Sequence, residues 1–228
     1  MNKMVIKSPI DNRDYIYQPT AGSIPSTYRA PKTRVRCQWL SSQCVAFACT
    51  QAMSQQYKQT SNINLTFSPG VVYANREQDD YQGEGWYIRK ALKQLQKYGV
   101  CLNKDFPFPE SYTTERKKFL KQQEMLLAAC EAYKISSYFR CNSELDTKKC
   151  IMEYGSVIVS ADIPVKGFLK RSISKKDYTG VGGHAFILVG WDENGWIAQD
   201  SYSIFRPFFG RFHINYDYPI NEFWGLII

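Results

Sequence analysis

Three cysteines lie within thirteen residues, in the stretch CQWLSSQCVAFAC that runs from Cys37 to Cys49. Such a group can bind a metal, form a disulfide, pack in a core or supply a nucleophile. The chain has no Cys-x2-Cys or Cys-x3-Cys pair, and this spacing gives no support to a zinc site. Seven cysteines are an odd number, and no export signal accompanies them, which favours reduced thiols over a disulfide framework.

Cys44 is the best placed of the three cysteines for nucleophilic chemistry. A nucleophilic thiol needs a helix N-terminus or an imidazole to lower its pKa from about 8.5. From Cys44 to about Tyr57, apolar residues recur at helical spacing, so Cys44 is expected at the start of a helix. Cys49 lies one turn further along, on an apolar face, and is expected in the core.

The chain has only two histidines, His184 and His213, which narrows the search for a partner. His184 follows two glycines at the start of a predicted strand, where its side chain can project into a cleft. His213 lies inside an alternating strand pattern and is interpreted as a half-buried or surface residue. Asp200 follows His184 across the predicted Asn194-Gly195 hairpin, and its carboxylate could accept a hydrogen bond from the imidazole.

The elements that must position these residues change in type along the chain. Residues 1–33 predict an extended arm. Helical patterns follow at 44–57, after Ser68 with Pro69 at the first helical position, at 86–98 before Gly99, and at 113–133. Strand patterns cover 156–161, 184–191, 196–199, 212–216 and 223–228. A helical first half and a β-rich second half predict an α+β fold, with two lobes and a cleft between them.

Composition excludes several classes of function. The net charge is +8 in 228 residues, but no basic run follows a helix face, so we expect no nucleic-acid partner. No apolar stretch reaches about 18 residues, so no membrane partner is expected. The N-terminus lacks the apolar region of a signal peptide. The expected location is therefore cytoplasmic, or virion-associated if the source is viral.

Four blocks of sequence resemble the papain (C1) family of cysteine proteases. They are Gln38 six residues before Cys44-Val-Ala-Phe, Gly183-His184-Ala-Phe-Ile-Leu-Val-Gly-Trp, Asp200-Ser201-Tyr202, and Ile88 to Leu102 with Asp105-Phe-Pro-Phe. The last block, and Asp11-Asn-Arg-Asp14-Tyr in the arm, are similar to bacterial and viral branches. The match spans roughly residues 34–218.

The resemblance implies a papain-like two-lobed fold with the active-site cleft between the lobes. The helical lobe would cover about 34–135 and the β-rich lobe about 136–228, together forming a peptidase domain over 34–228. Residues 1–33 would be a short pro-segment in place of the family's long propeptide. This arm either occupies or flanks the cleft, or wraps the back of a lobe.

The resemblance also implies roles for individual residues. Cys44 would be the nucleophile, His184 the general base and acid, and Gln38 a donor to the oxyanion beside the Cys44 N–H. Asp200 would orient His184. The expected substrate-binding positions are Gly83, Gly85, Gly183 and Tyr202. The partners would be polypeptide substrates, with no cofactor and no metal.

Departures from the family pattern keep alternatives open. Asp200 replaces asparagine, Val45 replaces tryptophan, and Ser41 replaces a half-cystine, so the usual disulfide between the lobes is absent. The main expectation is an endopeptidase that acts through a Cys44 thioester. A Cys-His-Asp group also serves transglutaminases and arylamine acetyltransferases, so acyl transfer to an amine is one alternative. The other is an inactive pseudoprotease that binds peptides. The roles of Cys141 and Cys150 stay open beyond packing.

Overall fold

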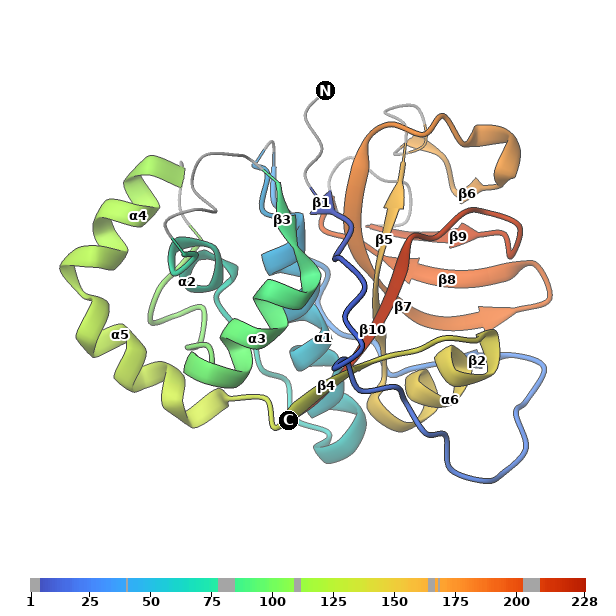
Figure 1. Cartoon of the computed structure of the whole chain (residues 1–228), viewed down its shortest axis with the longest axis horizontal. Coiled ribbons are helices and arrows are strands. Elements are labelled where there is room, and N and C mark those ends of the chain that lie inside the picture. The colour runs from blue at the N-terminus through green and yellow to red at the C-terminus, as the bar shows by residue number, and fades with distance from the viewer. Residues whose placement is uncertain are drawn as a thin grey trace.

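The computed structural model describes residues 5–39, 41–77, 85–108, 112–163, 167, 169–202 and 210–228, and the findings below concern these residues. Most helices occupy one side of the molecule, whereas a twisted sheet and one further helix occupy the other, with α1 (Cys44–Ser61) between them (Figure 1). Because α1 packs against both sides, its residues from Cys44 to Met53 are buried. The predicted helix start at Cys44 is confirmed.

Two further helix ends in the first half lie where the sequence predicts them. The Ser68 hydroxyl accepts the Val71 N–H at 3.1 Å and caps α2 (Pro69–Ala74). Gly99 ends α3 (Ile88–Tyr98), where its φ of 75° favours glycine. The prediction was wrong at 86–87, which form strand β3 (Trp86–Tyr87) because this segment pairs with the N-terminal arm.

The single helix expected over 113–133 is also corrected. The chain forms α4 (Tyr112–Lys121) and α5 (Gln123–Cys130), followed by a 3-10 turn at Glu131–Tyr133. Gln122 breaks the helix because its φ of −128° lies outside the helical range. Charged and apolar residues run through both pieces, so periodicity alone did not locate the break.

The second half forms a mostly antiparallel sheet. Its strands are β4 (Ser137–Arg140), β5 (Val157–Asp162), β6 (Ser172–Ile173), β7 (Gly183–Asp192), β8 (Gly195–Gln199), β9 (Arg211–Ile214) and β10 (Glu222–Ile227), with β2 (Tyr28–Arg29) added at β7. The order is β4-β10-β5-β7-β8-β9-β6, and among the described strands of this sheet only β6 and β9 pair in parallel. All five predicted strands are confirmed; β4 and α6 (Glu144–Tyr154) were not predicted.

The two faces of the sheet build two buried clusters. Along β7, Ile187 packs on the side of α1, whereas Phe186 and Leu188 pack on the opposite side with α6. The first cluster joins the helices to the sheet, and the second fills the interior of the curled sheet. This is the expected α+β architecture.

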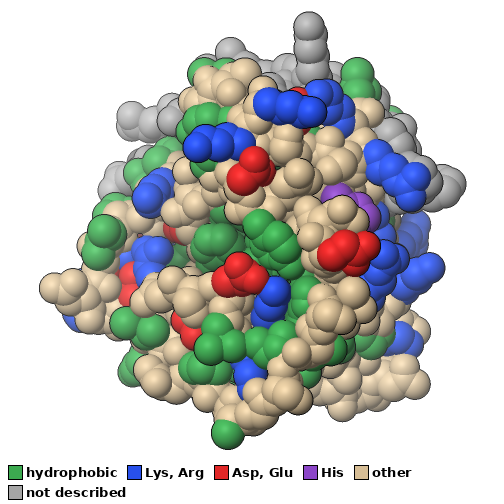
Figure 2. All heavy atoms as spheres, turned by 90° about the vertical axis from the view of Figure 1, so that its right-hand side faces the viewer, with side chains coloured by type: hydrophobic (Ala, Val, Ile, Leu, Met, Phe, Trp, Pro, Cys, Tyr) green, Lys and Arg blue, Asp and Glu red, His purple; other side chains and the backbone are tan. Residues whose placement is uncertain are grey.

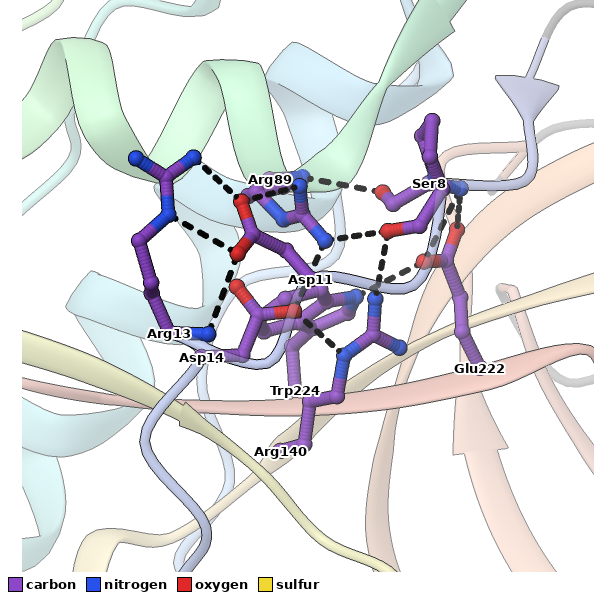
Figure 3. A network of polar contacts seen from close by, with 9 residues as sticks. Ser8, Asp11, Arg13, Asp14, Arg89, Arg140, Glu222 and Trp224 are labelled. Atoms are coloured by element: carbon purple, nitrogen blue, oxygen red, sulfur yellow. Dashed lines mark hydrogen bonds and ion pairs between the residues drawn. The ribbon is translucent and has the colours of Figure 1, made fainter.

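The N-terminal arm is fastened along most of its described length. Strand β1 (Val5–Ile6) pairs in parallel with β3. Beyond it, Asp14 contacts Arg89 at 2.7 Å and Arg140 at 2.8 Å, and the Ser8 N–H donates to buried Glu222 (Figure 3). Further contacts continue to β2, so residues 8–30 wrap the β-rich side.

The surface carries charges of both signs. On the face shown in Figure 2, Lys and Arg side chains lie among acidic and neutral ones rather than in one uninterrupted stripe. Within the described ranges, no helix has the length and apolar character needed to cross a membrane.

Candidate active site

Cys44 is the first residue of α1, and its side chain has no exposed surface. The backbone N–H groups of Cys44, Val45 and Ala185 act on the thiol and favour its ionised form. The last of these directly follows His184 at the start of β7. The N-terminus of α1 and the start of β7 therefore meet at the candidate nucleophile.

Two opposing effects act on the Cys44 thiol. Burial raises the pKa of Cys44 to about 12, although the three backbone donors act in the opposite direction. In this closed arrangement the thiol is therefore protonated at neutral pH. Burial likewise raises the pKa of Cys49, which lies further along α1 and has no surface exposure.

Gln38 is buried and held in one orientation by Ser201. Its Oε1 accepts the Ser201 hydroxyl at 2.5 Å, and its backbone N–H donates to the Ser201 carbonyl at 2.7 Å. The amide nitrogen Nε2 points instead to the loop before α1, where it donates to the Ser41 carbonyl at 2.6 Å. The donor end of the amide therefore lies toward the segment that leads to Cys44.

His184 lies in the second position of β7, opposite Ala161 of β5, and is fully buried. Its ring centroid is 5.2 Å from that of Tyr202 and 5.8 Å from that of Phe186. Aromatic rings thus cover the imidazole and reduce its contact with water.

Asp200 follows β8 and is also fully buried. Its Oδ1 accepts the Tyr202 N–H at 2.9 Å, and its own N–H donates to the Gly210 carbonyl at 2.9 Å. The pairing of Ile187 with Gln199 places the start of β7 beside the end of β8. Gln38, Asp200, Tyr202 and His184 are therefore linked through neighbouring contacts.

The predicted glycines differ in their surroundings. A Cβ on Gly183 would lie 2.9 Å from the Val5 carbonyl oxygen, so the arm approaches this backbone closely. Gly85 directly precedes β3, with which the arm pairs. Gly83 lies outside the described residues.

His213 belongs to a separate contact. Its Nε2 lies 2.9 Å from Asp192 Oδ2, on a partly exposed part of β9. The structure supports the interpretation of His213 as a half-buried strand residue. In the part of the chain that the structure describes, no group of three or more His, Cys, Asp or Glu side chains could hold a metal ion, and all seven cysteines are free.

Sequence reasoning missed one buried polar pair behind Cys44. Gln43, the N-cap of α1, donates from Nε2 to Glu115 Oε2 at 2.7 Å, and both side chains are buried. A signal was available, because Glu115 lies four residues before Phe119 on the buried face of α4.

Comparisons with known proteins agree with this geometry. Residues 26–209 match the family model described as papain family cysteine protease. Xylellain, a cysteine protease from Xylella fastidiosa, superposes with a TM-score of 0.82 and 22% identity over 100% of this chain and 97% of that chain. Bromelain from Ananas comosus, in complex with the E64 inhibitor, superposes with a TM-score of 0.72 and 16% identity over 90% of this chain and 100% of that chain.

A third structure comes from a larger protein. The cysteine protease and lectin-like domains of Cwp84, from Clostridium difficile, give a TM-score of 0.81 and 16% identity over 99% of this chain and 55% of that chain. At these identities the three structures show a shared fold. No curated protein matches the chain in sequence.

Proposed function

The chain belongs to the papain family of cysteine proteases, and we propose that it hydrolyses peptide bonds with Cys44 as the nucleophile. One observation carries the proposal. Cys44, the first residue of α1, lies in the same buried cluster as Ala185, the residue beside His184, and the Ala185 backbone acts on its thiol, so the nucleophile and its candidate base come from adjoining segments. Helix N-termini and imidazoles are the two environments that activate cysteine.

In the first half of the reaction, His184 takes the proton of the Cys44 thiol, and the sulfur attacks the carbonyl carbon of the substrate. The oxyanion would accept hydrogen bonds from Gln38 Nε2 and the Cys44 N–H, and the Ser201 contacts support this by fixing the amide. One such donor is worth about 3 kcal/mol in transition-state stabilisation. His184 then protonates the leaving amine as the C–N bond breaks, which leaves a thioester.

In the second half, His184 removes a proton from water, and the resulting hydroxide attacks the thioester carbonyl. The C–S bond breaks and the carboxylic acid product leaves. Asp200 would orient His184 and stabilise its protonated form. Because Asp200 is held by the Tyr202 N–H, its carboxylate is well placed to stay fixed during both steps.

The products of peptide turnover test this function. Peptides of eight or more residues should yield free carboxylic acids, identified by mass spectrometry, because water is the acyl acceptor. The same assay with an added primary amine separates the chemistries. Predominant amide formation with little acid would identify an acyltransferase instead, and no product of either kind would leave peptide binding as the role.

We further propose that the first residues of the arm inhibit the enzyme by covering the cleft. Val5 is buried and belongs to the cluster that contains Cys44, Ala185 and Trp86. Its carbonyl lies against Gly183, one residue before His184. A peptide substrate that bound as an added strand at β3 would compete with β1 for this edge.

A chain that lacks residues 1–7, the shortened chain, should therefore be more active than the full chain. Displacing the Val5 side chain costs about 2 kcal/mol. At 1.4 kcal/mol per tenfold, its removal should raise kcat/KM by about 30-fold. Removing it also reduces the burial that raises the Cys44 pKa, so iodoacetamide should label Cys44 faster. The measurement compares both quantities in the two chains, and equal values would refute the inhibitory role.

Partly exposed Cys37 is an internal control for labelling, since its rate should not change. A second control is a chain that lacks residues 1–24, in which the deletion is expected to damage the fold as well as remove Val5. This deletion also removes Tyr17, a buried aromatic that donates to Glu153 at 2.6 Å. Losing such a side chain should lower the free energy of unfolding by about 3 kcal/mol or more. The shortened chain keeps the contacts of Asp14 with Arg89 and Arg140, and the Ser8 nitrogen beside Glu222.

A further inference from the structure

Glu115 of α4 is a carboxyl group with no exposed surface. Its Oε2 accepts a hydrogen bond of 2.7 Å from the Gln43 side chain. Gln43 is the N-cap of α1 and directly precedes Cys44. A buried acid on one helix is thus bonded to the residue that fixes where the nucleophile's helix begins.

The surroundings of Glu115 are close-packed and contain little charge. A Cβ on Gly70 of α2 would collide with Glu115 Oε1, so the glycine makes room for the acid. Arg76, which follows α2, is the charged group that acts on Glu115 from another described element. On α5, Glu124 is exposed, and Arg116 of α4 itself donates to the Ala74 carbonyl.

A single hydrogen bond between two oxygens at this contact would satisfy both of them. Among the described residues, Gln43 Oε1 and Glu115 Oε1 are buried and have no hydrogen-bond partner. A proton on Glu115 Oε1 would supply the missing donor, so that acid and amide could form two hydrogen bonds. Burial raises the pKa of Glu115 to about 8, although the Gln43 hydrogen bond and the Arg76 charge act in the opposite direction. The neutral acid is therefore the favoured form at neutral pH.

We propose that Glu115 is a positioning residue for Cys44, and that its neutral carboxylic acid holds Gln43 and the first turn of α1 in place. The inference rests on the proposed role of Cys44. Ionisation would remove the donor to Gln43, so the N-cap and the first turn of α1 would be held by one hydrogen bond instead of two. Cys44 should therefore become less reactive as Glu115 loses its proton.

The variant Glu115→Gln tests this idea because an amide pair keeps both hydrogen bonds and cannot ionise. Iodoacetamide labelling of Cys44 in the shortened chain, from pH 6 to 10, is the readout. At pH 6 the labelling rate of the variant should match that of the natural protein. At pH 9 the variant should label about fivefold faster, since its amide keeps the second hydrogen bond to Gln43. Glu115→Ala should slow labelling at every pH. The proposal would be overturned if the natural protein and Glu115→Gln had the same labelling rates at every pH. It would also be overturned if Glu115→Gln labelled as slowly as Glu115→Ala at pH 6.

Stability against pH gives a readout that does not depend on catalysis. The pKa of Glu115 is raised from 4.5 to about 8 on folding, so its protonated form is favoured in the folded state. This stabilisation is complete below pH 4.5 and is lost as pH rises to about 8. Relative to Glu115→Gln, the natural protein should lose stability across that window and then level off. A constant difference would refute the neutral acid, whereas a pH-dependent difference in a chain without peptidase activity would refute only the proposed function.

Discussion

Replacing Cys44 by alanine in the shortened chain should abolish peptide hydrolysis, with a loss in kcat on the order of 10⁵-fold. The reason is chemical, since no thioester can form without the sulfur. What remains would be the contribution of Gln38 and substrate binding, on the order of 10³-fold over water. The measurement is kcat for a fluorogenic peptide. Substrate should still bind, because the substitution removes one atom at the base of the site.

Cys49→Ala is the matched control for this substitution. Cys49 is on the same helix, equally buried, and its pKa is raised in the same direction. The variant should keep its kcat and lose about 1 kcal/mol in the free energy of unfolding, because a small cavity replaces the thiol. Equal loss of activity in both variants would mean that damage to α1, and not a missing nucleophile, explains the result.

The sequence predicted those parts of the fold that local chemistry determines. Ser68 and Gly99 act on their own helix ends, through a side-chain cap and a positive φ, and both were located correctly. Trp86 and Tyr87 were assigned to a helix, yet they form a strand because Val5 and Ile6 pair with them. That pairing joins residues about eighty positions apart, and no local pattern reports it.

The candidate site also contains residues that local sequence patterns indicate and a contact that arises only when distant segments pack together. Cys44, Gln38 and His184 were proposed as site residues from helix spacing, glycines and family blocks, and each of these signals is local. The contact between Gln43 and Glu115 joins α1 to α4, and it was missed because the packing of two distant helices creates it. The closed state of Cys44 was also not predicted, since its burial comes from several segments that pack around it.

His184→Ala should lower kcat by about 10⁴-fold or more in the shortened chain, because both the leaving amine and the attacking water lose their proton-transfer group. His184→Ala should also change the pH dependence of the reactivity of the Cys44 thiol. Without a positive imidazolium to stabilise the thiolate, iodoacetamide labelling of Cys44 should require higher pH. These two measurements separate a catalytic histidine from a structural one, which would lower stability and leave the pH profile in place.

His213→Ala supplies the comparison that makes the result specific. His213 pairs with Asp192 at 2.9 Å, and about a quarter of its side chain is exposed (26%). Losing such a partly exposed pair should change the free energy of unfolding by about 1 kcal/mol or less and leave kcat unchanged. If both histidine variants kept their activity, the Cys44–His184 mechanism would be refuted. If only His184→Ala lost it, and the Cys44 labelling profile moved to higher pH, the histidine that follows Gly183 would be identified as the group that activates the thiol.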